Sequence, residues 1–521
     1  MAEKGRRIVI IGGGISGLTA GIYGRLAGYE VDIYEKNPLP GGECTGWDRQ
    51  GFHIDNCMHW LMGTRGGTAL NDIWRTVGAV DESVGVNDFP YMYRSELKGQ
   101  SLTLWKDIDR TEREMLELSP EDGDEIRRLM QVCRQAQSVI IPAERPMEQW
   151  GIPYSLGMLA SLKEMTPVLR AYPNMDTQDL MNRFKHPLIA CLISDFCTKE
   201  SAASSFPMAY GNFISGDGGV PVGGSRAMAL RMAEKFQSLG GRLHLGRPAA
   251  KLNVEGNRVQ SLTLADGTVA EGDWFVPACD PSFLWSTLLD ESYMTDMFRE
   301  YYSQPQNYPI YSMFQVALAV EDERDLLGGD YNLDVSDIRS EPWMGQRISV
   351  KTFAYEPDFA PKGKHIMQIL YGGTDAGYDY FKQLYEADRE AYQAKKQEIA
   401  QALLRAIEER WPEYQGKLRI LDIWTPVTYE RWCNAYRGYN QACVLGKNSR
   451  KNAYPSPFLR LKNVVLAGQW LSPPGGLPGA AITGKFAIAR IKRKFRFNRT
   501  TAQRNLIWLA SAVAILLTII L

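Results

Sequence analysis

The sequence predicts an α/β protein, and three observations near its amino terminus support this fold class. Residues 8–11 form an apolar, β-branched run, which is typical of a buried parallel strand. A glycine cluster follows directly, and apolar residues then recur at helical spacing from residue 15 to about residue 28. A second strand pattern occupies residues 29–35. A strand, a tight turn, a helix and a further strand in this order indicate a parallel sheet with crossover helices.

The glycine cluster has the spacing of a dinucleotide-binding turn. The three glycine places are filled by Gly12, Gly14 and Gly17. The first glycine permits the sharp turn, the second lets a pyrophosphate approach the backbone, and the third lets helix and strand pack closely. Free amides at Ile15 and Ser16 would direct the positive end of the helix toward the phosphates. This turn predicts a Rossmann-like domain, although a glycine-rich turn in an ordinary α/β domain is the alternative.

The end of the second strand strengthens the dinucleotide interpretation. Glu35 stands there, where a carboxylate suits a ribose with a free 2′-hydroxyl and disfavours a 2′-phosphate. A turn-rich loop follows, and its paired Gly41 and Gly42 allow a second close approach to the backbone.

Length and composition limit the class of protein. The 521 residues are enough for two or three domains and a large core. The net charge of −1 shows no basic excess, so we expect no nucleic-acid partner. Eight cysteines lack CxxC spacing, and we interpret them as reduced thiols of a cytoplasmic protein without a metal site. Only a short charged segment precedes the first strand, so we predict no signal peptide.

The pattern along the chain predicts two interleaved domains. The dinucleotide-binding domain is expected at residues 1–90, 215–285 and 456–490, and the α+β substrate domain at 91–214 and 286–455. Residues 111–206 are helical in pattern, 311–320 alternate like a strand, and one long helix is predicted over 385–411. Residues 463–470 read as a strand, followed by a glycine–proline loop and a small-residue helix at 480–490. The amino-terminal end of that helix carries a partial positive charge, so it is a second place where an anion would be stabilised.

The carboxyl terminus predicts membrane attachment. A basic linker at 491–505 precedes sixteen uncharged residues at 506–521. As a helix, this tail would reach about 24 Å, slightly less than a hydrocarbon core of roughly 30 Å. It is apolar on all sides, unlike an amphipathic helix that docks on a domain. We expect it to anchor the protein to membrane lipids, with the catalytic body in the cytoplasm and the basic linker beside anionic lipids.

These motifs together resemble a known family. They comprise the GGGISGL turn at 12–18, the segment from Glu35 to Pro38 with Gly41 and Gly42, and residues 221–264, 356–365, 425–438 and 467–479. The chain resembles the phytoene desaturase, carotenoid isomerase and retinol saturase group of FAD-dependent oxidoreductases as far as about residue 490. The residues that this resemblance implies for FAD binding are Gly12, Gly14, Ile15, Ser16, Gly17, Glu35, Lys36, Gly41, Gly42, Ala249, Gly468, Gln469, Gly479 and Ala480.

The chain also departs from the family pattern. Glu43 follows the paired glycines, where many relatives have an arginine, and a carboxylate does not bind phosphate. His59 lies near the expected cofactor within Met58-His59-Trp60, where retinol saturase-like members tend to have a His-Tyr pair. His59 is the one candidate acid or base, and a structural hydrogen-bonding role is the alternative.

The resemblance implies an enzyme that acts on carbon–carbon bonds of a hydrophobic polyisoprenoid. Desaturation, saturation and redox-neutral cis–trans isomerisation share this scaffold and stay open. An amine-oxidase-like flavoprotein would need a polar, aromatic-caged amine pocket. A non-catalytic prenyl-lipid binder is the alternative outside enzymes. No second dinucleotide fingerprint is present, so we expect oxygen, a quinone or another small molecule as the electron partner. The sequence does not indicate an oligomeric state.

Overall fold

A parallel four-stranded sheet forms the centre of the amino-terminal part of the chain. The computed structural model describes residues 7–139, 141–338, 341, 343–373, 375–450 and 454–493. The strands lie in the order β13 (Trp274–Pro277), β1 (Arg7–Ile11), β2 (Glu30–Tyr34) and β9 (Arg242–His244). All of their pairings are parallel. The α/β class predicted from the sequence is confirmed, and the segments that build this sheet come from distant parts of the chain.

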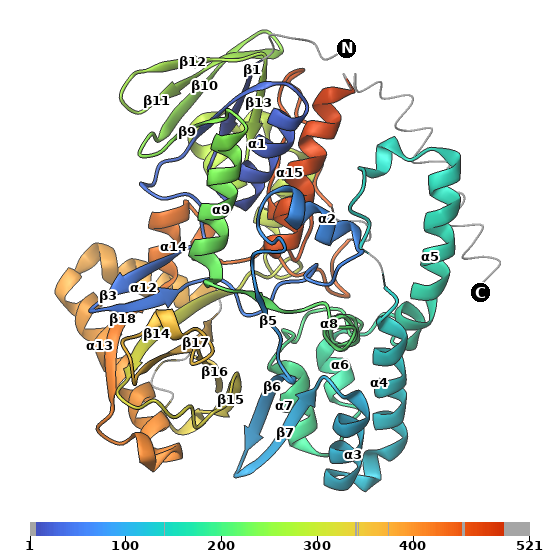
Figure 1. The fold of residues 1–521 in the computed structure, drawn as a ribbon, viewed down its shortest axis with the longest axis vertical. Coiled ribbons are helices and arrows are strands. Elements are labelled where there is room, and N and C mark those ends of the chain that lie inside the picture. The colour runs from blue at the N-terminus through green and yellow to red at the C-terminus, as the bar shows by residue number, and fades with distance from the viewer. Residues whose placement is uncertain are drawn as a thin grey trace.

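Strand β1 is buried on both faces. Its side chains alternate between two cores, as the pleat requires. Ile8 and Ile10 belong to a core with helices α1 (Ile15–Leu26), α9 (Gly224–Ser238) and α15 (Gly476–Lys492). Val9 and Ile11 face the opposite core, which includes the antiparallel strands β10 (Ala249–Glu255), β11 (Arg258–Leu264) and β12 (Val269–Glu271). The glycine turn at the end of β1 is therefore held from both sides (Figure 1).

Helix α15 lies directly against α1, although most of the chain separates them in sequence (Figure 1). A side chain at Gly484 would place its Cβ 2.4 Å from the carbonyl oxygen of Ser16, so only glycine permits this approach. The predicted helix at 480–490 is present and begins earlier, at Gly476. The predicted strand at 463–470 is reduced to a bridge between Val464 and Phe275 and a short 3₁₀ turn, Gln469–Leu471.

A second, seven-stranded sheet forms the lower part of the molecule (Figure 1). Its strands lie in the order β18 (Leu418–Trp424), β14 (Ser312–Val320), β17 (His365–Gly373), β16 (Arg347–Thr352), β15 (Tyr331–Asp334), β6 (Tyr91–Leu97) and β7 (Gln100–Trp105). The pairing of β15 with β6 is parallel, and the other pairings are antiparallel. The predicted strand at 311–320 corresponds to β14.

Two helices pack on this sheet where the sequence predicted one. They are α12 (Asp375–Ala387) and α13 (Arg389–Arg410). The side chain of Asp388 accepts hydrogen bonds from the backbone N–H groups of Glu390 and Ala391, at 2.9 and 3.0 Å. It is thus the N-cap of α13. The predicted helix over 385–411 corresponds to α13, which begins at Arg389 rather than at residue 385, because helical periodicity continues across this cap from the end of α12.

Residues 111–206, which were predicted to be helical, form a separate hydrophobic core beside β6 and β7. Its helices are α3 (Ile108–Leu118), α4 (Gly123–Ala136), α5 (Ile152–Ala171), α6 (Thr177–Met181), α7 (Pro187–Ser194) and α8 (Ser205–Ile214). The remaining elements are β3 (Gly46–Arg49), β4 (Phe52–Asp55), α2 (Ala69–Thr76), β5 (Val86–Asn87), β8 (Val220–Pro221), α10 (Pro281–Phe283), α11 (Asp296–Ser303) and α14 (Pro426–Cys433). From this arrangement we propose two domains. The dinucleotide-binding domain comprises residues 1–90, 215–285 and 456–490, and the substrate domain comprises residues 91–214 and 286–455.

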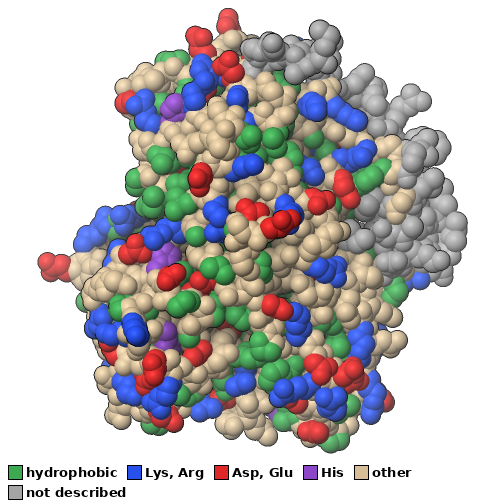
Figure 2. Space-filling view, in the orientation of Figure 1, with side chains coloured by type: hydrophobic (Ala, Val, Ile, Leu, Met, Phe, Trp, Pro, Cys, Tyr) green, Lys and Arg blue, Asp and Glu red, His purple; other side chains and the backbone are tan. Residues whose placement is uncertain are grey.

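Charged side chains of both signs are interspersed over the face shown in Figure 2. Among the residues that the structure describes, no helix is both long and apolar enough to cross a membrane. The predicted tail at 506–521 and most of the basic linker lie outside the described residues.

Candidate functional site

The turn between β1 and α1 needs glycine at two of its positions, Gly12 and Gly17. Gly12 has a φ of +104°, a conformation that favours glycine. A Cβ at Gly17 would lie 2.0 Å from the carbonyl oxygen of Gly12. The N-cap of helix α1 is Gly14, so no side chain of that residue caps the amides of Ile15 and Ser16. An uncapped helix start reached through glycines fits a phosphate group.

Glu35 lies beside this turn and is 5% exposed. Its carboxylate accepts hydrogen bonds from the backbone N–H groups of Gly13 and Asn37, at 2.7 and 2.8 Å. Burial raises the pKa of Glu35, and these two hydrogen bonds oppose that effect. A carboxylate oriented by the glycine turn itself fits a ribose hydroxyl.

The structure shows contacts for the two other residues predicted near the nucleoside. Ala249 begins β10, and the nearby Arg247 donates its backbone N–H to the carbonyl oxygen of Glu35 at 2.8 Å. Lys36 instead reaches across to α14 and the residue after it. Its Nζ donates to the carbonyl oxygen of Arg431 at 2.8 Å and to Oδ1 of Asn434 at 2.6 Å. The role of Lys36 in cofactor binding stays a prediction.

A second glycine pair meets the first turn. The N–H of Gly41 donates to the carbonyl oxygen of Gly13 at 2.9 Å, and Gly41 and Gly42 have φ values of +115° and +63°. A Cβ at Gly42 would lie 3.4 Å from the Cα of Gly14. These two turns together form what we call the glycine cradle, residues 12–17 and 41–42.

Glu43 continues from the cradle into the interior. Burial raises the pKa of Glu43 well above its usual range, and the nearby Cys57 and Asp280 raise it further. This environment favours the protonated carboxyl, which carries no charge that would repel a phosphate. The raised pKa of Glu43 thus lessens the objection to a carboxylate beside the cradle.

The start of α15 forms the other side of the site. Gly468 has a φ of +149° and donates its N–H to Oγ1 of Thr483 at 3.0 Å. The side-chain oxygen of Gln469 accepts the N–H of Gly476 at 2.8 Å. Gly479 and Ala480 then lie in the first turns of α15. Helix α15 packs on α1 where Gly484 approaches Ser16, and we propose that the amino-terminal ends of both helices face the cofactor.

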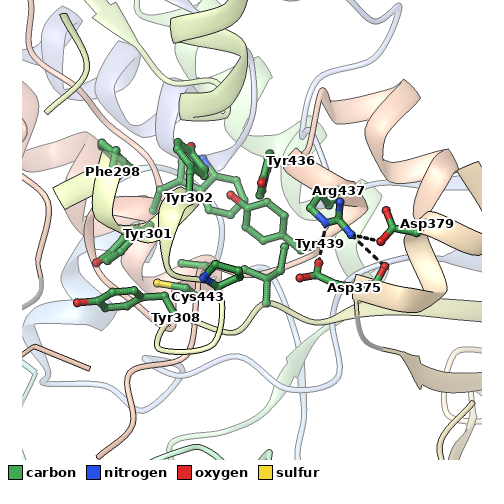
Figure 3. A pocket seen from close by; sticks show the side chains of 14 residues that line it. Phe298, Tyr301, Tyr302, Tyr308, Asp375, Asp379, Tyr436, Arg437, Tyr439 and Cys443 are labelled. Atoms are coloured by element: carbon green, nitrogen blue, oxygen red, sulfur yellow. Dashed lines mark hydrogen bonds and ion pairs between the residues drawn. The ribbon is translucent and has the colours of Figure 1, made fainter. Parts of the chain in front are cut away.

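An aromatic cavity of about 330 Å³ adjoins this site. Ten of its lining residues are labelled in Figure 3: Phe298, Tyr301, Tyr302, Tyr308, Asp375, Asp379, Tyr436, Arg437, Tyr439 and Cys443. Trp470 and Ala442 complete the wall toward the site. Trp470 follows Gly468 and Gln469 in sequence, and the N–H of Ala442 donates to the carbonyl oxygen of Pro474 at 2.9 Å. The cavity thus shares its wall with the loop that leads into α15.

The polar groups of this cavity are satisfied by one another. Arg437 donates to Asp375 and to Asp379, each at 2.7 Å (Figure 3). Burial raises the pKa of Tyr302 and of Tyr439 well above the usual value for tyrosine. The tyrosine hydroxyls therefore stay neutral, and the cavity presents mainly ring faces and edges.

His59 lines a second, smaller cavity of about 40 Å³. Its Nδ1 lies 3.7 Å from Oδ2 of Asp330, and its side chain is 37% exposed. Lys351, which is 2% exposed, donates to the carbonyl oxygens of Met58 and His59 at 2.7 and 3.2 Å. Burial lowers the pKa of Lys351. Tyr355 also lines this cavity. The structure therefore surrounds His59 with polar groups that the sequence did not indicate.

Comparisons with known proteins identify the family. The model of the flavin-containing amine oxidoreductases matches residues 15–492, so the chain belongs to this family. Phytoene desaturase (lycopene-forming) of Paracoccus sp. is 22% identical over 507 residues, which cover 92% of this chain and 95% of that protein. Prolycopene isomerase 2 of an Oncidium hybrid cultivar is 22% identical, with coverage of 94% and 84%.

Solved structures agree on the fold. Putrescine oxidase bound to putrescine matches with a TM-score of 0.57 and 15% identity, over 93% of this chain and 98% of that one. An oxidoreductase from Methanosarcina mazei matches with a TM-score of 0.56 and 16% identity, with coverage of 93% and 100%. The family resemblance stated from the sequence is confirmed, and the protein is an FAD-dependent oxidoreductase of the amine oxidase family. The glycine cradle, the buried Glu35 and the uncapped start of α1 fit that cofactor.

Sequence reasoning missed the residues of the aromatic cavity and, apart from His59, those of the smaller one. The aromatic cavity is assembled from residues 298–310, α12, the loop after α14, and Trp470. No spacing in the sequence connects these segments. Among the residues that the structure describes, no group of His, Cys, Asp or Glu is arranged to hold a metal ion.

Proposed function

We propose that this oxidoreductase acts on carbon–carbon bonds of an apolar polyisoprenoid, with desaturation as the leading reaction. The observation that carries this proposal is the aromatic cavity that shares its wall with the loop leading into α15, which the sequence predicts to lie along the flavin. Flat aromatic walls suit a planar conjugated chain, because ring faces and edges pack against π-systems. Several of the relatives similar to this chain are named as enzymes of carotenoids.

The charges in the cavity favour an apolar substrate over an amine. A substrate ammonium group would need an unpaired carboxylate or exposed ring faces. The two carboxylates in the described lining, Asp375 and Asp379, are both paired with Arg437. Breaking these bonds to bind an amine would leave the arginine without its partners. The paired carboxylates offer no countercharge to an ammonium group, whereas the ring faces of the same cavity would accept one, so putrescine is included in the substrate test below.

The size of the cavity limits how a substrate would bind. About 330 Å³ lies at the lower end of the range of sites for small ligands, which is roughly 300–1,000 Å³. A long polyisoprenoid would therefore be held by one part of its chain while the rest extends outside. Such a substrate resides in a bilayer, which is why we retain the proposal that the tail at 506–521 attaches the protein to a membrane with its catalytic body in the cytoplasm.

Bound FAD supplies the transfer of a hydride to or from carbon. The residues of this chain would do the rest. The aromatic wall from Tyr302 to Trp470 would exclude water and orient the substrate chain. The positive end of α15 would stabilise negative charge beside it. His59 lines the separate cavity of about 40 Å³ beside Asp330, and its part in proton transfer stays a hypothesis that the His59→Ala variant tests.

The alternatives differ in their electron balance. A redox-neutral carotenoid isomerase would change double-bond geometry without net electron transfer, and a retinol saturase-like enzyme would consume reducing equivalents. A prenyl-lipid binder would show neither change. Products formed under oxidising and under reducing conditions would therefore separate these functions.

The experiment incubates the purified holoenzyme with phytoene, other carotenoids, retinoids and putrescine, aerobically and after anaerobic reduction of its flavin. We expect new carbon–carbon double bonds, detected as longer-wavelength absorbance and a mass loss of hydrogen. An Ile310→Trp substitution places a larger side chain in the cavity and should lower this rate at least tenfold with FAD retained. The control is Ala394→Trp, on the exposed face of α13. This substitution should leave the rate unchanged. Hydrogen peroxide formed with putrescine, with every polyisoprenoid unchanged, would overturn the proposal.

A further inference from the structure

Two cysteines, Cys44 and Cys57, follow the last paired residues of the β3–β4 hairpin, where it meets the glycine cradle. In the hairpin register, Gly46 pairs with Asp55. The N–H of Asn56 donates to the carbonyl oxygen of Thr45 at 3.0 Å, so pairing continues one step beyond the strands. The next pair in this register is Cys44 with Cys57. Residues directly opposite each other point to the same face of the ladder.

This placement is compatible with a disulfide. Opposite residues of an antiparallel pair have Cα atoms about 4.5–5.5 Å apart, and disulfides span about 4.4–6.8 Å between Cα atoms. The Cys57 side chain lies near enough to Cys44 to raise the pKa of its thiol. The two residues are free cysteines whose expected Cα separation falls within the disulfide range.

Cys44 and the residue after Cys57 are both held to Ser225 of α9. The thiol of Cys44 donates to the carbonyl oxygen of Ser225 at 3.4 Å. The hydroxyl of Ser225 accepts the N–H of Met58, next to Cys57, at 3.0 Å. Asp55 fixes this turn further, since it accepts the N–H and the hydroxyl of Ser225 at 2.5 and 2.6 Å. The pair is thus preorganised by a buried network.

The pair borders the expected flavin. The N–H of Cys44 donates to the carbonyl oxygen of Gly41 at 3.1 Å, and Gly41 belongs to the glycine cradle. Cys57 lies near enough to Glu43 to affect the pKa of that carboxyl. By contrast, Cys133 and Cys197 are buried in the helical core beside β6 and β7, away from the cradle.

We propose that Cys44 and Cys57 are a redox-active pair that exchanges two electrons with the bound flavin. On oxidation, both S–H bonds break, one S–S bond forms, and two electrons and two protons pass to FAD, which becomes FADH₂. The reverse step cleaves the disulfide at the expense of FADH₂. The proposal rests on FAD binding, which the family establishes, and is independent of the polyisoprenoid substrate.

The environment gives the two thiols different roles. The nearby Cys57 side chain and burial raise the pKa of Cys44 well above its usual value, so this thiol stays protonated and shielded. Cys57 is only partly buried and is the thiol that an external disulfide or dithiol reaches first. Exchange with such a partner would pass electrons through Cys57 to the flavin, because the attacking group is a thiolate on an accessible sulfur.

The first test counts electrons in the holoenzyme by anaerobic titration with dithionite, followed by flavin absorbance. Oxidised wild-type protein should take up four electrons per flavin, since a disulfide and a flavin each accept two. Cys57→Ser should take up two. Cys197→Ser is the matched control, because it removes a buried cysteine far from the cradle, and should take up four. Uptake of two electrons by the wild type would overturn the proposal.

The second test needs no variant and so does not depend on how Cys57→Ser folds. Oxidised and dithiothreitol-treated wild-type holoenzyme are denatured in alkylating reagent, digested and analysed by mass spectrometry. We expect a Cys44–Cys57 linked peptide in the oxidised sample and two alkylated peptides in the reduced one. Separately alkylated Cys44 and Cys57 in both samples would refute the pair, whatever the outcome of the substrate experiments.

Discussion

Replacing Gly14 by valine should remove FAD without unfolding the protein. Gly14 has φ −72° and ψ −178°, a region open to all L-residues. A Cβ there would lie 3.8 Å from the carbonyl oxygen of Gly41 and 3.9 Å from the Cα of Gly42, which is ordinary contact. The added side chain fits the protein alone and occupies the space that a pyrophosphate needs.

The expected energies follow from these contacts. Valine is a poorer N-cap than glycine, which lowers the free energy of unfolding by about 0.5–1 kcal/mol. Valine also restricts the unfolded chain, which raises the free energy of unfolding by about 0.4–1 kcal/mol. The free energy of unfolding of the apoprotein should therefore change by less than about 1 kcal/mol. Wild type with FAD at a hundred times its Kd gains about 2.7 kcal/mol, and Gly14→Val should lose this gain.

Gly17→Ala is the matched control for the fold. Its Cβ would meet the carbonyl oxygen of Gly12 at 2.0 Å, so the turn must distort at a cost of about 1–3 kcal/mol or more. Flavin absorbance per protein and thermal unfolding with and without added FAD measure both effects. A Gly14→Val protein with wild-type flavin content would refute the placement of the pyrophosphate. If the Gly14→Val protein lost its flavin and its apoprotein were also clearly less stable, the explanation that valine only occupies the space of the pyrophosphate would be refuted.

Two further predictions concern His59 and the tail. His59→Ala should lower the single-turnover rate about 10²–10⁴-fold if His59 transfers the proton, with FAD still bound; unchanged single-turnover kinetics, measured by stopped-flow absorbance, would leave it a structural role. Deleting residues 506–521 should move the protein from the membrane pellet to the supernatant with its FAD content unchanged. Full-length protein that fractionates without detergent in the supernatant would contradict membrane attachment.

Local signals in the sequence were reliable because the interactions behind them are local. The turn from β1 into α1 was predicted from consecutive residues, and the glycine positions follow from φ angles and close contacts within a few residues. The same is true of β14, whose alternating pattern reflects its pleat. The failure at Asp388 was also local: a cap interrupts a helix without interrupting its apolar periodicity, so the pattern over 385–411 reads as one helix.

The sequence by itself determined the glycine cradle, the position of Glu35 and the class of cofactor, since backbone conformation and residue spacing specify them. Only the tertiary structure decided which side chains surround the flavin site. Tyr302, Arg437 and Trp470 become neighbours because α11, the loop after α14 and the loop before α15 pack together. Packing of this kind depends on side-chain shape across long separations in sequence, and neither periodicity nor motif spacing contains that information.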